Sequence, residues 1–244
     1  MLLEALRWPT IDGVSIAPAP LALIRARAPH PVTSGATLDF RTLTPERGGL
    51  FDYHVFGPGT VIDAPAAHDD APARARNVTF GRLVLGRPLP HPLFTPERHP
   101  DMRRARAEEL ATQDLVLHEL AVLPPDLRPL HRLDDDRWQS TSVNDLYRRV
   151  IQRNDRLVKL IGEGAEPQLI DAEELAVHDA LLALFDNERL ERPVLDAVGQ
   201  PLGSLQWLAG DVAVGLRAFA AKSDTARARK VEAVALGLGF ALSR

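Results

Sequence analysis

The most regular pattern of apolar and polar positions begins at residue 142. Apolar residues recur there at alternating spacings of four and three, as they do along one face of a helix. They are Val143, Tyr147, Val150, Leu157 and Ile161. Asn154 occupies the polar slot of this seam, where it can fix the register of two packed helices. Ser142, with Asp145 three residues later, is the expected N-cap.

A second helix is expected to run back along the first. Gly162, Gly164 and Pro167 break the first helix, because glycine favours turns and proline cannot continue a helix. Asp171, with Glu174 three residues later, has the pattern of an N-cap. The return seam is predicted at Leu175, His178, Leu182 and Phe185. The pattern therefore predicts an antiparallel helical hairpin.

The outward faces of the two expected helices differ in charge. The first carries the cations Arg148, Arg149, Arg153, Arg156 and Lys159. The second carries Glu173, Glu174 and Asp179. A projecting hairpin with a charged surface more often docks a partner than catalyses a reaction. The simpler interpretation is a solvated hairpin that buries its seam, and the pattern alone leaves both open.

The rest of the chain has shorter predicted elements. Apolar alternation predicts strands at residues 78–85 and 115–123, and a charged stretch predicts a short helix at 101–112. Residues 124–130 should form a rigid extended linker, because proline fixes its own φ and disfavours helix before it. Two further helices are expected at 204–221 and 225–242. The predicted fold class is α+β, mainly α with small β elements.

Composition and charge narrow the class of protein. The 244 residues suffice for one large domain or two small ones. A formal net charge of −4 argues against a nucleic-acid-binding polycation. The absence of cysteine excludes disulfides, thiolate catalysis and cysteine-ligated metal sites. No apolar run approaches the roughly 20 residues that cross a bilayer, and the first residues lack a signal-peptide pattern. We therefore expect a cytoplasmic protein without membrane contact.

Several polar residues are candidate metal ligands by residue type. Asp63, Asp69 and Asp70 lie near His68 in sequence, and together with His54 they could ligate a metal. Ordinary surface polarity explains them better. The sequence also lacks a Gly-x-Ser-x-Gly elbow and a phosphate-binding glycine loop.

Two other features invite a functional interpretation that their context disfavours. Asp134, Asp135 and Asp136 are consecutive in a predicted loop, whereas carboxylates that hold a catalytic ion must converge in space. His178 is better explained as a half-buried histidine with satisfied ring nitrogens. We expect no metal ion and no cofactor.

Two segments, residues 40–58 and residues 122–187, resemble a known family. Residues 40–58 begin Phe-Arg-Thr-Leu-Thr-Pro-Glu and continue through Gly-Leu-Phe to Phe-Gly-Pro. They are similar to the N-terminal signature of the beta' subunit of bacterial RNA polymerase. Residues 122–130, Val-Leu-Pro-Pro-Asp-Leu-Arg-Pro-Leu, resemble the segment before the lid of the same subunit. Residues 144–151, Asn-Asp-Leu-Tyr-Arg-Arg-Val-Ile, resemble the start of its clamp coiled coil. The similarity is colinear over about residues 10–206.

The resemblance implies a docking site for a sigma factor. In this family, the coiled coil is the main docking site for region 2 of sigma. The contact positions of the family match Arg153, Glu173 and Ala180 here, with Arg156 as a fourth. An exposed arginine and glutamate on adjacent arms would form a polar contact pair. A small alanine would let a partner helix approach closely.

The resemblance also divides the chain into three regions. Residues 1–141 would form a clamp-like, loop-rich α+β region, with an exposed loop at 59–77 and a lid-like stretch at 122–141. Residues 142–192 would form the coiled-coil hairpin. Residues 193–244 would form a rudder-like segment and a helical tail that packs on the clamp-like region. The tail is expected to cover apolar surface with Trp207, Leu216, Phe219, Val234 and Leu238.

The chain departs from the family in ways that bear on function. Asp52 occupies the position of the first zinc-binding cysteine, and residues 59–77 replace the rest of that loop. The magnesium-binding aspartate signature has no counterpart, so the chain is not expected to be an enzyme on its own. Residues 206–244 lose the basic pattern of the switch region.

Three functions remain open from the sequence. The first is a non-catalytic beta' clamp homologue that binds sigma region 2 through its hairpin and modulates transcription. The second is a split beta' fragment that acts as a structural subunit of a polymerase. The third is a structural relic with an unrelated protein partner. The expected partners are a sigma factor or polymerase subunits, with nucleic acid a weaker candidate and no small-molecule substrate.

Overall fold

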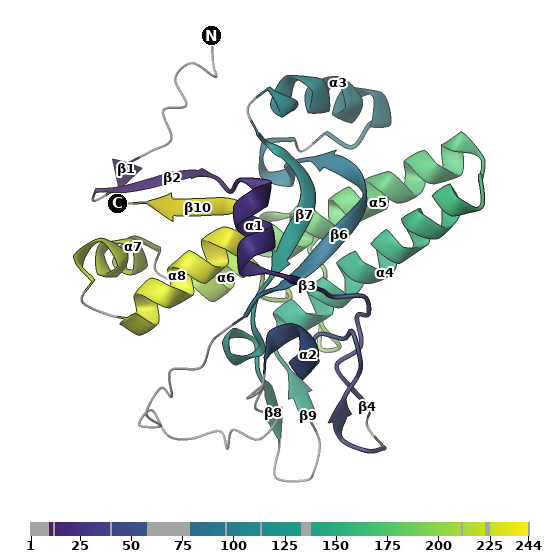
Figure 1. Ribbon diagram of the computed structural model, residues 1–244. Coiled ribbons are helices and arrows are strands. Elements are labelled where there is room, and N and C mark those ends of the chain that lie inside the picture. The colour runs from purple at the N-terminus through teal and green to yellow at the C-terminus, as the bar shows by residue number, and fades with distance from the viewer. Residues whose placement is uncertain are drawn as a thin grey trace.

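The structure, a computed structural model, describes residues 10–11, 13–39, 41–57, 79–95, 97–112, 114–132, 138–210, 212–222 and 225–243. These residues form the predicted α+β fold, in which a small sheet, a long helical hairpin and shorter helices surround a main core and two smaller apolar clusters (Figure 1). The expected loop at 59–77, His68 and the consecutive aspartates 134–136 lie outside the described residues.

The central sheet has the strand order β3-β6-β7. Strand β3 (His30–Pro31) runs parallel to β6 (Gly81–Pro90), and β7 (Val116–Val122) runs antiparallel to β6. Both long strands are thus confirmed, although β6 starts later and continues further than predicted. The register of β6 and β7 shifts between Val84 and Leu89, so β6 carries a bulge.

Asn154 fills this bulge. Its Nδ2 donates to the carbonyl oxygen of Val84 at 3.0 Å, and its Oδ1 accepts from the backbone N–H of Gly86 at 2.8 Å. A Cβ atom on Gly86 would lie 2.8 Å from Cγ2 of Val158, so glycine permits the close approach. Asn154 therefore fixes the hairpin to the sheet. The expectation was that it would fix the register of the two helices, but both hydrogen-bond partners of its amide lie on β6.

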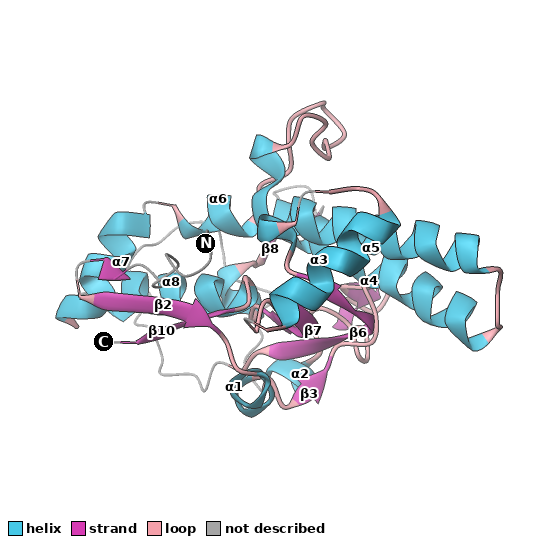
Figure 2. Cartoon of the chain, turned by 90° about the horizontal axis from the view of Figure 1, so that it is seen from above, coloured by secondary structure: helices cyan, strands magenta, loops and turns pink. Residues whose placement is uncertain are grey.

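The hairpin consists of α4 (Ser142–Gly162) and α5 (Pro167–Asp186). The predicted seam of α4 is confirmed for Val143, Tyr147, Val150, Asn154 and Leu157, which are at most 3% exposed, whereas Ile161 is half-buried. Figure 2 shows the hairpin extending away from the rest of the molecule, with its turn at the far end.

Both predicted N-caps are wrong. The N-cap of α4 is Thr141 and that of α5 is Glu166. Pro167 opens α5, because its missing N–H and fixed φ suit the first turn of a helix. Asp171 therefore lies inside α5.

The return seam also differs from the prediction. Of the predicted positions, His178 and Phe185 are buried, whereas Leu175 and Leu182 are half-buried. Val177, Leu181 and Leu184 are fully buried in their place. Near its C-terminal end α5 contacts α6 and the 3-10 turn η1 as well as α4. Because neighbours surround it there, burial is not confined to one stripe.

Shorter helices surround this framework. They are α1 (Leu21–Arg27), α2 (Tyr53–Phe56), α3 (Pro100–Ala111), α6 (Leu205–Ala209), α7 (Val212–Ala221), α8 (Thr225–Gly237), and the 3-10 turns η1 (Pro92–Phe94), η2 (Pro125–Leu127) and η3 (Asn187–Arg189). The helix predicted over 204–221 is split at Gly210, whose φ of 66° and ψ of −133° are not helical. The last predicted helix ends at Gly237, and a strand follows it. No described helix is long and apolar enough to span a membrane.

Segments from near both ends of the chain share a second sheet. Its order is β1-β2-β10, formed by β1 (Thr10–Ile11), β2 (Val14–Pro18) and β10 (Phe240–Ser243) (Figure 1). Two ribbons complete the described strands: β4 (Leu38–Asp39) with β5 (Thr44–Pro45), and β8 (Leu130–Arg132) with β9 (Trp138–Ser140).

Several apolar residues of the tail lie in two hydrophobic clusters. Leu216 and Phe219 pack in a cluster with Val14 of β2, while Val234 joins the main core and Leu238 packs against it. Trp207, expected to do the same, is 65% exposed.

Arg128 joins three parts of the chain at the base of the hairpin. It is fully buried and donates to the carbonyl oxygens of Leu123 at 2.7 Å and Leu50 at 2.6 Å, and to Oδ1 of Asn144 at 2.8 Å. Its guanidinium also lies 5.7 Å from the ring centroid of Tyr147. The two segments that resemble beta', residues 40–58 and 122–187, therefore meet at one buried cation.

Candidate docking site on the helical hairpin

Two arginines of α4 share one carboxylate of α5. Nη1 of Arg153 lies 3.2 Å from Oε1 of Glu173, and Nε of Arg156 lies 3.1 Å from Oε2. The Glu173 side chain is 6% exposed, against 39% for Arg153 and 64% for Arg156. The expectation that Glu173 faces outward is wrong. The carboxylate is held between the arms because two guanidinium groups compensate its charge there.

This arrangement orients the two guanidinium groups. Each guanidinium has five N–H donors, and the pairing with Glu173 occupies a fraction of them. The remaining donors of these half-exposed and exposed side chains can reach a partner. What the three residues present to solvent is therefore cationic.

Ala180 lies beside this cluster in a cavity of about 230 Å³. It is 2% exposed, so it does not lie on an outward surface as expected. Its neighbours Ala176 and Ala183 also line the cavity, which we call the alanine groove. The charged residues of its described lining are Arg98, Arg149, Arg153, Arg192 and Asp179. The groove is strongly cationic because Asp179 is the one carboxylate among them, and Arg98 lies 3.9 Å from it.

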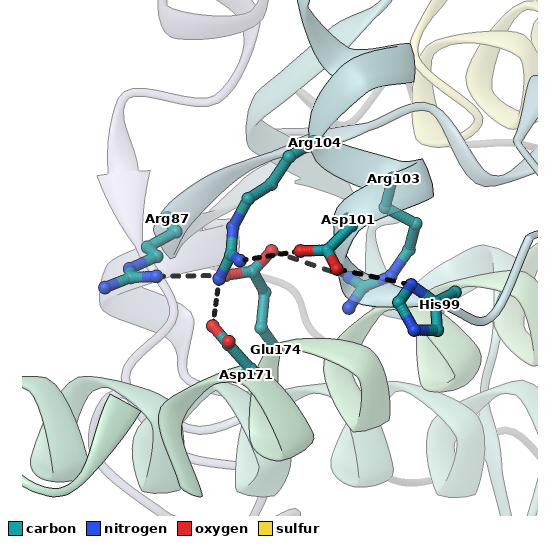
Figure 3. A network of polar contacts seen from close by, with 7 residues as sticks. All are labelled: Arg87, His99, Asp101, Arg103, Arg104, Asp171 and Glu174. Atoms are coloured by element: carbon teal, nitrogen blue, oxygen red, sulfur yellow. Dashed lines mark hydrogen bonds and ion pairs between the residues drawn. The ribbon is translucent and has the colours of Figure 1, made fainter. Parts of the chain in front are cut away.

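A second polar network fastens α3 to α5 (Figure 3). Oε2 of Glu174 lies 3.1 Å from Nη1 of Arg87, and its Oε1 lies 3.5 Å from Nη1 of Arg103. Arg104 and Asp171 form a further ion pair. Glu174 was predicted on the outward face, but its side chain is 8% exposed because α3 covers it.

Arg103 and His178 are buried without hydrogen-bond partners among the described residues. Burial lowers the pKa of Arg103, and the nearby Glu174 carboxylate opposes that shift. Burial also lowers the pKa of His178 to about 4, and the positive charges of Arg103 and Arg98 and the ring of His91 act in the same direction. The expectation of a half-buried, satisfied His178 is wrong.

Asp52 stabilises a turn before α2. Its carboxylate accepts from the backbone N–H of Gly48 at 2.6 Å and of His54 at 2.8 Å, and from Nδ1 of His54 at 3.0 Å. Burial alone would raise the pKa of this carboxyl, but the hydrogen bonds from Gly48 and His54 hold it below its usual value. The described residues contain no group of three or more side chains suited to a metal ion.

The fold and the site together define an α+β module with a projecting helical hairpin that bears a cationic groove on its surface. A family model described as RNA polymerase Rpb1, domain 1, matches residues 101–210. The chain is 47% identical to the DNA-directed RNA polymerase subunit beta' of Bifidobacterium adolescentis over 91 residues, which cover 37% of this chain and 7% of that protein.

Two other relatives agree with this result. The beta' subunits of a Nocardioides species and of Rubrobacter xylanophilus are 45% and 46% identical over 93 and 91 residues, which cover 38% and 37% of this chain. In both cases the match spans 7% of the relative. The chain therefore resembles the N-terminal region of the bacterial beta' subunit and corresponds to a small part of its length.

The matched range contains the whole hairpin, Arg128 and the four candidate residues. It starts after residues 40–58, although Leu50 from that segment contacts Arg128.

Sequence reasoning identified Arg153, Arg156 and Glu173, which the structure brings together, and Ala180 beside them. The role of Arg128 and the ion pairs that join α3 to α5 were not predicted from the sequence. The available signal for these ion pairs was the arginine-rich start of α3.

Proposed function

We propose that this chain is a non-catalytic, beta'-like clamp module that docks on region 2 of a sigma factor through α4 and α5 and modulates transcription. The observation that carries the proposal is the Arg153–Glu173–Arg156 cluster beside the alanine groove, on a hairpin that resembles that of beta'.

The geometry suits an acidic helix as the docking partner. Arginine binds carboxylates with two parallel N–H donors, which gives strength and orientation. Glu173 holds Arg153 and Arg156 in place before a partner arrives, so less side-chain freedom is lost on binding. The small side chains of Ala176, Ala180 and Ala183 leave room for the backbone of the partner.

The second candidate function is a structural subunit of a split polymerase. It is favoured by the named relatives, all of which are beta' subunits, and by the intact Arg128 junction between the two beta'-like segments. This role would require further contacts with other large subunits.

A capture experiment separates these functions. The tagged chain is used as bait in a lysate of its host, together with an Ala180→Arg variant whose added side chain would fill the alanine groove. Recovery of a sigma factor without core polymerase, lost in the variant, supports the proposal. Recovery of core polymerase by both baits favours the subunit role. Recovery of neither leaves the relic as the explanation.

A further inference from the structure

A second cavity of about 580 Å³ lies on another part of the molecule. It is bounded by α1, α3 and β7, and Gly239 closes one side. We call it the β7 groove. Figure 1 shows α1 beside β7 and α3 beyond one end of the strand. The hairpin contributes no residue to its described lining.

The β7 groove follows a free strand edge. In the sheet order β3-β6-β7, β7 lies at the margin, and no other described strand pairs with it. The lining includes the consecutive residues Leu115, Val116, Leu117, His118 and Glu119. Successive side chains of a strand point to opposite faces, so a cavity touched by consecutive residues runs along the edge and not over one face. An edge strand presents backbone N–H and C=O groups that can pair with another chain.

The groove is apolar inside and acidic at its margins. Leu21 and Ile24 of α1 face it from one side, and Ala107 and Ala111 of α3 face it from the other. Its described lining contains three carboxylates and no lysine or arginine.

The three carboxylates differ in their pairing. Glu119 is paired with Arg25 at 2.8 Å, so its charge is compensated. Glu108 and Asp114 are exposed and form no ion pair with a described residue. The charge of the groove therefore favours a cationic occupant.

A second copy of the chain fits this groove poorly. The edge is recessed between two helices, which admit a single extended strand more readily than the margin of another folded domain. In a twofold dimer, the same residues would face each other across the interface. Glu108 and Asp114 would then approach their own copies, and like charges opposite each other are destabilising.

We propose that the β7 groove binds an extended segment of another protein that carries lysine or arginine among apolar residues. The segment adds as a strand to β7, its backbone forms the hydrogen bonds, and its cations lie near Glu108 and Asp114. This interaction is separate from docking on the hairpin.

The test uses the intact chain and a fluorescent, acetylated short peptide that alternates lysine and valine. Matched probes carry glutamate in place of lysine, or N-methyl groups that block one edge of the peptide backbone. Fluorescence anisotropy should show binding of the lysine peptide that weakens at least about tenfold with either change, because each removes a central contribution to binding.

Four variants locate the site. Ala111→Phe should fill the groove and reduce binding of the lysine peptide at least about tenfold. Ala105→Phe, on the exposed part of α3 outside the groove, should leave it unchanged. Glu108→Lys should also weaken binding of the lysine peptide. The loss should be larger at low salt, because surface charges are screened least there. The Arg153→Ala variant should bind the peptide normally, which separates this result from any failure of hairpin docking.

Four results would overturn the proposal. Equal binding of the N-methylated peptide would mean that no strand is added. Equal binding by Ala111→Phe would place the peptide elsewhere. A concentration-dependent dimer abolished by Ala111→Phe would assign the groove to a second copy. Binding that appears after deletion of residues 1–9 and not before it would assign the groove to the chain's own first residues.

Discussion

At the scale of single residues, buried charges determine how the parts of the chain meet. Arg128 is fully buried, yet its hydrogen bonds and the surrounding aromatic rings satisfy it. Burial nevertheless lowers its pKa to about 10. Within the hairpin, Glu173 is a buried carboxylate whose charge is compensated by two arginines. These residues act through charge placed inside the protein, where a missing partner is costly.

Replacement of Arg128 should unfold the junction at the base of the hairpin. Arg128→Ala leaves the carbonyl oxygens of Leu50 and Leu123 unpaired and opens a cavity, so the free energy of unfolding should fall by at least about 3 kcal/mol. Urea denaturation measures this loss. Arg189→Ala, at a side chain that is 79% exposed, is the matched control and should change stability little. Equal stability of both variants would contradict the central role of Arg128.

His178 should make the protein less stable in mild acid. Its pKa is about 4 in the folded chain and 6.5 when unperturbed, so the unfolded chain binds the proton more tightly. The stability that His178 contributes is complete above pH 6.5 and is lost as the pH falls toward 4. Between about pH 7.5 and pH 5 the free energy of unfolding should fall by about 2 kcal/mol from this group. Thermal unfolding of His178→Leu across this range should show a smaller loss, and an identical loss would contradict this assignment.

At the scale of elements, the hairpin is held to the sheet by polar contacts as well as by its apolar seam. The amide of Asn154 forms hydrogen bonds to the bulge of β6. Arg103 and Arg104 of α3 form ion pairs with carboxylates of α5. The hairpin is therefore attached to β6 through the middle of α4 and to α3 through the first half of α5. A docking surface on such an element keeps its geometry when a partner binds.

Loss of the Asn154 amide should loosen this attachment. Asn154→Leu leaves the N–H of Gly86 and the carbonyl oxygen of Val84 without their partner, at a cost of about 1–3 kcal/mol each when they stay buried. The midpoint of urea denaturation should fall, and hydrogen exchange at Gly86 should speed up. Gln152→Ala, on the exposed face of α4, serves as the control. Unchanged exchange at Gly86 would contradict the role given to Asn154.

The sequence predicted those elements whose pattern is local. The seam of α4 follows from its spacing, because one face is buried and the opposite face is exposed. The seam of α5 could not be predicted in full from spacing, because α4, α6 and η1 bury this helix on several sides. The partner of Asn154 depends on a bulge in a distant strand, which no local pattern indicates. The burial of Glu173 likewise depends on arginines 17 and 20 positions away.

At the scale of the whole molecule, the tail and the first strands stabilise each other. β10 follows α8 and pairs with β2, while α7 packs on the same strand. The tail thus supplies apolar cover and a strand partner to the start of the chain. The hairpin remains clear of this contact and extends from the opposite side (Figure 2).

Truncation after Gly203 should therefore destabilise the whole protein. It would remove Leu205 and Val234 from the main core and leave β2 without β10. Exposed apolar surface costs about 25 cal/mol per Å², so the truncated chain should aggregate or melt at a much lower temperature. Trp207→Ser, at an exposed position in the same tail, should melt as the unaltered chain does. A truncated chain as stable and soluble as the whole would contradict this account.

The most direct test of the central claim is a titration of the purified chain with region 2 of each sigma factor of its host. We expect at least one to bind, and Arg153→Ala should weaken that binding at least about tenfold, or about 1.4 kcal/mol. The melting temperature should stay within about two degrees, because Arg156 still pairs with Glu173 and the lost contact is partly exposed. Lys159→Ala, at a side chain that is 73% exposed nearer the tip of α4, should bind nearly as well as the unaltered chain. Failure of every sigma factor to bind at high micromolar concentration, or equal binding by the Arg153 and Lys159 variants, would contradict the account.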